Sequence, residues 1–279
     1  MTAVLRPVRS AASRLGAYLG LAVVVVLVIV LVATGIFPER RWSPFGDIRV
    51  WQFIGQGLLV TLQIGAVALV ASFVLSVPLA LARISAPRPV RAVVTGWIEL
   101  VRATPVLALI LVITLLMPRT GLDVSPIWSA TLALTLYTSA VLAEIVRAGV
   151  LSIPRGEVDA SRSLGLSYVA TMRHVVLPQA LTRMTPAIVS QLITLVKDTS
   201  LASIAGVQEL VGYARSSFVF FGNIAETLFI VACIYFVICY SLSRLSRRLE
   251  VRRPAEAAVV VVGEEDQLLT SEPDRSQPA

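Results

Sequence analysis

The chain has 279 residues, of which 56% are hydrophobic and 15% are charged, and its mean hydropathy is +0.82. A soluble domain carries about 25% charged residues, so an ordinary soluble protein is excluded and a lipid bilayer is the expected solvent. The net charge of +7 is not accompanied by a basic surface interleaved with aromatic residues, which excludes nucleic-acid binding as well.

Apolar runs long enough to cross a membrane recur along the chain. A hydrocarbon core about 30 Å thick needs about 20 helical residues, because each residue adds about 1.5 Å. We therefore predict an all-α, polytopic helical membrane protein with six transmembrane helices, at about 17–37, 57–82, 93–117, 127–150, 186–206 and 224–243. The first run follows several arginines, so a signal peptide is the alternative there, but its length favours a retained helix.

The arginines between the runs predict the orientation, because Lys and Arg are retained on the cytoplasmic side of a membrane. With the N-terminus inside, most of these arginines fall on the inner side, and both termini are cytoplasmic. The outer segments then hold only Arg40, Arg41, Arg49, Arg119 and Arg215.

Two pairs of opposite charges lie near the inner ends of the third and fourth runs. Glu99 and Arg102 are three residues apart, as are Glu144 and Arg147, so the members of each pair share a helix face. Pro105 follows the first pair and is expected to kink that helix. We interpret both pairs as structural first. Glu144 and Arg147 are also candidates for a translocation path or gate.

The segment 151–184 is too polar to span a membrane and too patterned for a linker. Pro154 and Gly156 end the preceding helix, and a short helix with acidic residues in its first turn follows. Gly165 is suited to the left-handed position after the last turn, and Ser167 is suited to cap a second helix. The pattern predicts a helix–turn–helix on the inner side.

The second helix of this segment carries an apolar stripe that requires a partner surface. Its members recur at helical spacing and are Tyr168, Met172 and Val175, or Val169, Met172 and Val176. The partner is either another protein or the lipid headgroup region, on which amphipathic hairpins often lie. Pro178 is expected to end the regular hydrogen bonding before the fifth run.

The only lysine, Lys197, stands beside Asp198 near the middle of the fifth run. A charge at the centre of a membrane helix costs roughly 2.5–3.5 kcal/mol on insertion scales. Adjacent helical residues point about 100° apart, so the two do not form a simple pair. Thr194 and Ser200–Ser203 are expected to offer hydroxyl contacts. Either the charges form a buried polar knot, or they line a wet path or gate, which we favour. With Glu144 and Arg147 they would present both signs of charge to a zwitterionic solute.

The residues required for several kinds of catalysis are missing. A nucleotide-binding P-loop needs a lysine followed by Ser or Thr, but Lys197 is followed by Asp198. His174 is the single histidine, which excludes His-rich zinc sites, and we expect a packing or interface role for it. Cys233 and Cys239 are six residues apart and fit neither a metal pair nor a redox motif. We expect no enzyme, metal or cofactor in this chain, so any ATP dependence must come from a partner.

Residues 153–180, IPRGEVDASRSLGLSYVATMRHVVLPQA, resemble the signature loop of ABC importer permeases. Asp159, Ala160 and Ser161 stand where the family has Glu-Ala-Ala, Gly165 stands at the family glycine, and the segment ends on the Leu-Pro pair. Aspartate for glutamate and serine for alanine are conservative departures, and the spacing is intact. The resemblance implies docking of this loop on a cytoplasmic ATPase through Gly156, Asp159, Ala160, Ser161, Gly165, Leu177 and Pro178.

Three further stretches, TLYTSAVLAEIVRAGVLSIPRG, ELVRATPVL and VKDTSLASIAGVQEL, resemble the polar amino acid branch of that family, and the first run with its RRWSPFGD loop most resembles glutamate-type permeases. The resemblance implies a five-helix ABC importer permease core at 55–248, an extra helix and outer loop at 1–54, and a cytoplasmic tail at 249–279. The composition of the tail predicts disorder.

The resemblance also implies the partners of an importer in a bacterial inner membrane. They are a second permease subunit, identical or related, two cytoplasmic ATPases that bind ATP and magnesium, and an extracytoplasmic solute-binding protein. Two other functions stay open at this point. An ion-coupled secondary transporter would use the intramembrane charges as a relay, and a non-transporting scaffold would use the loop to recruit a soluble partner.

Overall fold

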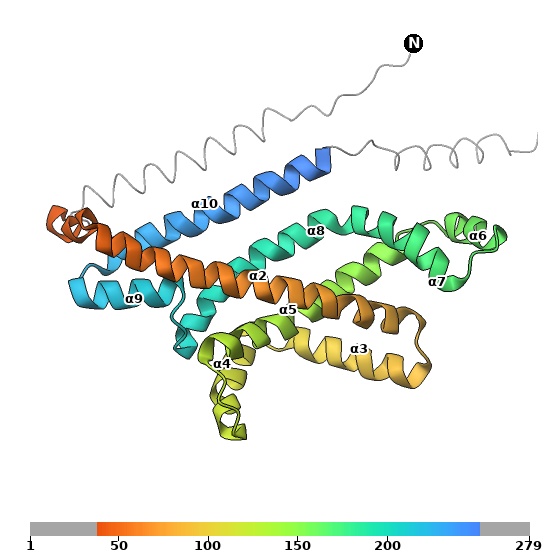
Figure 1. Cartoon of the computed structure of the whole chain (residues 1–279), viewed down its shortest axis with the longest axis horizontal. Coiled ribbons are helices and arrows are strands. Elements are labelled where there is room, and N and C mark those ends of the chain that lie inside the picture. The colour runs from red at the N-terminus through yellow and green to blue at the C-terminus, as the bar shows by residue number, and fades with distance from the viewer. Residues whose placement is uncertain (1–37, 252–279) are drawn as a thin grey trace, which may run out of the picture.

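The computed structural model describes residues 38–251, and it describes their side chains as far as residue 245. Long helices dominate this part of the chain (Figure 1). The predicted first span at 17–37 and most of the predicted tail lie outside the described residues. In chain order the elements are η1 (Glu39–Arg41), η2 (Ser43–Gly46), α2 (Ile48–Ser85), α3 (Arg88–Ala103), α4 (Val106–Leu116), η3 (Met117–Thr120), α5 (Pro126–Leu151), α6 (Arg155–Ser163), α7 (Tyr168–Thr171), the π-helical turn η4 (Met172–Val176), α8 (Leu177–Asp198), η5 (Thr199–Ala205), α9 (Leu210–Phe221) and α10 (Ile224–Val251).

Four helical stretches are long and apolar enough to cross a membrane. They are Ile48–Ser85, Pro126–Leu151, Tyr168–Ala205 and Ile224–Leu245. A fifth is formed only if α3 and α4 are counted together. These stretches coincide with five of the six predicted runs. The described residues therefore confirm an all-helical membrane protein with four or five candidate spans, whereas a count of six is not confirmed.

The predicted third span, 93–117, is broken rather than kinked. The helices Arg88–Ala103 and Val106–Thr120 meet at an angle of 100°. Thr104 and Pro105 both have extended ψ angles, of 129° and 128°. A proline removes a backbone donor and disfavours helical geometry in the residue before it, so the two residues together end α3 and redirect the chain.

The helix α5 lies at the centre of the bundle and crosses α2 (Figure 1). Its buried face consists largely of small residues, including Ala130, Ala133, Ala140 and Ala143, all fully buried. Small side chains allow membrane helices to approach closely, and hydroxyl groups add contacts between them. Here Ser72 of α2 donates a hydrogen bond to the carbonyl oxygen of Thr135 in α5, at 3.0 Å.

The start of α2 is defined by the acidic residue directly before it. Asp47 caps the helix by accepting a hydrogen bond from the backbone N–H of Arg49 at 2.9 Å. The Arg49 guanidinium also pairs with this carboxylate, 2.8 Å away, and lowers the pKa of Asp47. We call the end of the bundle that carries α6 and α7 the loop end. The Asp47 cap stands at the opposite end (Figure 1).

Close packing of α2 on α9 depends on Gly57. A Cβ at this position would lie 2.8 Å from the Tyr213 Cβ and 3.0 Å from the Leu210 Cα. We expect Gly57→Ala to lower the free energy of unfolding by about 1–3 kcal/mol, because backbone atoms cannot move away cheaply. Gly55→Ala is the matched control in the same helix, since nothing lies within 4 Å of its added Cβ. Thermal unfolding in one detergent would compare them, and equal midpoints would contradict the prediction.

Candidate functional site

The predicted helix–turn–helix is present at the loop end of the bundle. α6 ends at Ser163, and Gly165 follows with a φ of +81°, the left-handed conformation expected of it. The Gly165 N–H donates to the Arg162 carbonyl at 2.9 Å, and the Leu166 N–H donates to the Ser161 carbonyl at 3.3 Å. Ser167 caps α7 by accepting a hydrogen bond from the Ala170 N–H at 3.3 Å. The turn chemistry inferred from the sequence is thereby confirmed.

Three polar contacts form a chain from this hairpin through α8 to the end of α5. The Ser161 hydroxyl lies 3.1 Å from the Thr171 hydroxyl, which connects α6 to α7. The Gln179 amide in α8 donates to the Glu157 carboxylate in α6. Arg183 of α8 donates to the carbonyl oxygen of Ser152, at 2.6 Å, where α5 ends. A displacement of α6 would therefore act on α8 directly and on the end of α5 through α8.

The signature residues divide into two groups by exposure. Gly156, Asp159, Ala160 and Gly165 are exposed on the hairpin, whereas Ser161 is buried against α7. One face of the hairpin is therefore open, and the other holds α6 against α7. Leu177 and Pro178 lie outside the hairpin, in the first turn of α8.

The predicted apolar stripe on the second helix is only partly free. Met172 and Val176 pack against the protein's own core, and Val176 is 3% exposed. Tyr168 and Val169 remain exposed, at 45% and 70%, beside Leu164 at 83%. The covered half of the stripe thus finds its partner within the chain. The exposed half forms an apolar surface at the tip of the hairpin, defined by Leu164, Tyr168 and Val169.

The chain does not leave the helical conformation at Pro178, which corrects the expectation that hydrogen bonding ends there. The chain stays helical from Tyr168 to Asp198, and Pro178 lies in the first turn of α8. The disturbance appears instead just before it, as the π-helical turn Met172–Val176. A proline cannot bond to the residue four positions earlier, and widening the preceding turn relieves its clash with that carbonyl. His174 lies in this turn, with its Nδ1 3.0 Å from the Ala170 carbonyl oxygen.

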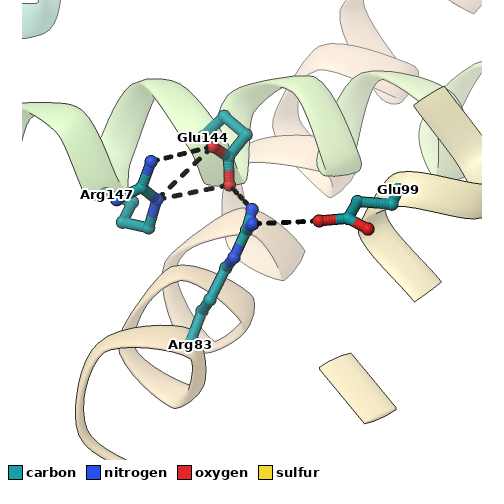
Figure 2. Close-up of polar contacts among 4 residues, drawn as sticks. All are labelled: Arg83, Glu99, Glu144 and Arg147. Atoms are coloured by element: carbon teal, nitrogen blue, oxygen red, sulfur yellow. Dashed lines mark hydrogen bonds and ion pairs between the residues drawn. The ribbon is translucent and has the colours of Figure 1, made fainter. Parts of the chain in front are cut away.

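A network of four charges joins three helices near the loop end (Figure 2). Glu144 and Arg147 of α5 pair at 3.1 Å, as their spacing predicted. Glu144 also binds Arg83 of α2, whose second amino group lies 3.4 Å from Glu99 of α3. The Arg83 and Glu144 side chains are only 18% and 19% exposed. Two arginines thus flank one largely buried carboxylate.

The partner of Glu99 differs from the one its spacing indicated. Glu99 contacts Arg83, and no ion pair described in the structure joins it to Arg102. The bundle brings the end of α2 between α3 and α5, and this placement offers Glu99 a cation on a neighbouring helix. Arg83 was considered in the sequence only as a charge of the inner side, so its central place in the network was missed.

Lys197 and Asp198 stand apart from this network. They lie at the end of α8, about 30 Å along the helix from Leu177, whereas Glu144 is about 10 Å from the end of α5 at the loop end. Lys197 is exposed and Asp198 half-buried, and among the described residues no ion pair involves either of them. The structure therefore separates the four predicted path charges into two groups at different depths.

Within residues 38–245, no hydrogen bond joins the expected hydroxyl groups to the side chains of Lys197 or Asp198. Thr194 donates to the Ser190 carbonyl at 3.2 Å, Ser200 to the Lys197 carbonyl at 2.7 Å and Ser203 to the Ser200 carbonyl at 2.7 Å. Hydroxyl groups in helices donate to the carbonyl oxygen three or four residues earlier. Here this local hydrogen bond forms in place of a contact with the neighbouring charge.

A buried polar cluster around Glu209 was not found from the sequence. Glu209 is fully buried, and its Oε1 accepts from the N–H groups of Val211 and Gly212, at 2.9 and 3.0 Å. Its Oε2 accepts from Thr61 of α2 at 3.2 Å and from Tyr235 of α10 at 3.1 Å. One carboxylate thereby caps α9 and joins it to two other helices. The only signal in the sequence was an acid directly before an apolar helix.

Among the described residues, no group of three or more His, Cys, Asp and Glu side chains is arranged to hold a metal ion. Long apolar helices, an exposed hairpin at one end and charges between the spans are the features of a membrane transport subunit. The comparisons with known proteins support this class and make it specific.

The family model described as the binding-protein-dependent transport system inner membrane component matches residues 72–253, more than half of the chain. This protein belongs to that family. It is a permease subunit of an ABC importer, a multi-pass component of a bacterial inner membrane, and it is not an enzyme.

Relatives and a solved structure agree with the family. The chain is 37% identical to the probable glutamine ABC transporter permease protein GlnP of Bacillus subtilis, over 72% of this chain and 94% of the relative. It is 33% identical to the glutamate transport system permease protein GluD of Corynebacterium glutamicum, over 79% and 82%. A solved amino acid ABC transporter with histidines superposes with a TM-score of 0.69 at 29% identity, over 75% of this chain and 98% of that one.

Proposed function

We propose that this permease imports a polar amino acid, with glutamate or a close relative as the preferred solute. The relatives named above transport glutamine and glutamate, and others are permeases for arginine and L-cystine. The similarity to the glutamate permease extends over 79% of this chain, more than for the glutamine permease, although identity is lower. The core responsible is the range 55–248, with both termini in the cytoplasm.

The exposed hairpin is the observation that carries the proposed mechanism. Its tip presents an apolar surface beside the exposed signature residues, its first helix is bonded to α8, and α8 is bonded in turn to the end of α5. We assign this face to a cytoplasmic ATPase subunit that binds ATP and magnesium. Closure of two such ATPases would move α6, and the contacts from α6 to α8 and from α8 to α5 would change the access of the bundle from one side of the membrane to the other.

The two charge groups are proposed to act at different depths of one translocation path. The network of Arg83, Glu144 and Arg147 joins α2 and α5 near the loop end, where it would hold the inner side closed. Lys197 and Asp198 are near the other end of α8, and the exposure of Lys197 disfavours a polar knot within this chain. A second permease subunit, identical or related, would enclose these charges in a shared wet path.

Reconstituted transport tests the function. The permease, its ATPase and its solute-binding protein in liposomes are expected to accumulate labelled glutamate only with ATP, and an ion gradient alone should give no uptake. Competition by unlabelled polar amino acids would rank the solutes. Lys197→Ala and Asp198→Ala should lower the uptake rate while the complex still assembles. Uptake driven by an ion gradient without ATP would contradict the mechanism, and assembly failure in both variants would favour the structural knot.

A further inference from the structure

An apolar groove lies between α2 and α10, away from the sites described above. The two helices share a small core in which Leu58 and Ile234 pack around Val50, Ile54 and Val231. Beside this core the groove has a volume of about 390 Å³. Its lining includes Trp51 and Leu58 of α2 and Ile230, Cys233, Ile234 and Val237 of α10. The only N–H group among these side chains, the Trp51 Nε1–H, is bonded to the Phe45 carbonyl oxygen at 2.9 Å.

The helix α10 is the least covered of the four unbroken candidate spans in the described part of the chain. Only 11% of its most apolar window is buried, whereas the value for α5 is 67%. Val237 is 61% exposed beside the groove. Membrane helices associate through van der Waals packing of complementary surfaces, so a concave apolar strip between two helices is suited to a third helix.

The described chain begins beside this groove. Asn223, directly before α10, donates a hydrogen bond to the carbonyl oxygen of Arg41 at 3.3 Å. The ring of Trp42 meets that of Phe229 in α10 edge-on, with centroids 6.3 Å apart. Arg41 and Trp42, among the first described residues, therefore lie within a few residues of the start of α10.

That segment has the length and composition of a membrane helix. Residues 17–37 contain no charge and are mainly Val, Leu, Ile and Ala. As a helix they would extend about 30 Å, enough to cross the hydrocarbon core. Because their C-terminal end meets the start of α10, they would run antiparallel to both α10 and α2.

We propose that residues 17–37 form a helix that packs in the groove between α2 and α10. The groove is then an intrachain docking site, and the arrangement goes beyond the proposed transport function. It assigns this face of the permease to the chain's own first span and leaves the hairpin and the charges of α8 on surfaces available to other subunits. Lipid or a second permease would be the occupant if the proposal is wrong.

Cys233 lines the groove and provides a natural reporter for this contact. It lies about 13–14 Å along α10 from Ile224, and the same distance counted back from Phe37 falls at Val28. Single cysteines placed at each position from 22 to 34, in full-length protein carrying Cys239→Ala, would be oxidised in native membranes and also treated with a short bismaleimide. Thiol counting by mass-tagged maleimide and non-reducing gels would separate links within one chain from links between chains.

We expect links within one chain, centred near Val28 and recurring every three or four residues, because only one face of a helix meets the groove. The same cysteines combined with Cys233→Ala should give none. Links mainly between chains would place a second copy in the groove and overturn the proposal. The absence of links at every position with both reagents, in variants that remain in the membrane with intact uptake, would leave lipid as the occupant and overturn it as well.

Discussion

Replacing Gly165 by valine is expected to lower the initial rate of ATP-driven uptake about tenfold or more. Gly165 has a φ of +81°, and an L-residue in the left-handed region costs roughly 1–2 kcal/mol, more for a branched side chain. About 1.4 kcal/mol reduces a population tenfold, so the hairpin would rarely present its docking face. ATPase activity of the complex should lose its dependence on solute, and co-purification of the ATPase should weaken. Initial uptake rates in proteoliposomes would measure the effect.

Gly121→Val is the matched control for this experiment. Gly121 has a φ of +80° and open space around its Cβ position, as Gly165 does, but it lies in the loop between α4 and α5. The same backbone strain is introduced there without touching the hairpin. We expect a similar loss of thermal stability in both variants and a large loss of uptake in Gly165→Val alone. Equal uptake in the two would remove the hairpin from the coupling mechanism.

Removal of the Glu144 carboxylate is expected to have the second large effect. Glu144→Leu leaves Arg83 and Arg147 without the anion between them, and Arg83 is only 18% exposed. Breaking a fully buried ion pair on one side costs about 3–5 kcal/mol, and we expect a loss near the lower end of this range, because the pair is partly buried and Arg83 keeps Glu99 at 3.4 Å. Thermal unfolding of the purified permease should show a large drop in midpoint, and uptake should be lost. Arg49→Leu breaks an exposed pair with Asp47 and should change the midpoint little.

The double variant Arg83→Leu, Glu144→Leu separates stability from function. Replacing both members of a buried pair by apolar residues is often nearly neutral, and Arg147, which is 33% exposed, can extend toward the interface. We expect most of the lost stability to return while uptake remains low, because the proposed inner closure depends on the charges themselves. If uptake returned together with stability, the network would be structural only.

The spans could be predicted from the sequence because lipid imposes a local rule on every helix that crosses it. Each span must be apolar over its own length, so five of the six predicted runs coincide with helices in the described residues. The first run, 17–37, remains a prediction. The break at Pro105 was underestimated, because the sequence shows a proline but not whether neighbouring helices hold the chain straight.

Short-range contacts along the chain also determined the hairpin turn and one ion pair of α5. Gly165 is left-handed, Ser167 caps α7, and Glu144 pairs with Arg147, because each of these features depends on residues at most a few positions apart. The same locality explains why Thr194 and the serines after Lys197 bond to backbone carbonyls. A helix offers those acceptors at fixed positions, whatever the rest of the bundle does.

Only the tertiary structure decided the contacts between distant segments. It brought Arg83 between Glu99 and Glu144, connected Thr61 and Tyr235 through Glu209, and separated Lys197 from the charges of α5. It also covered Met172 and Val176 while leaving the hairpin tip exposed. By itself, then, the sequence determined the membrane helices and the turn at Gly165, since these follow from hydropathy and short-range geometry, and the resemblance of residues 153–180 to a signature loop indicated the permease family. The partner of each charge depends on which helices pack side by side, and that is a property of the whole bundle.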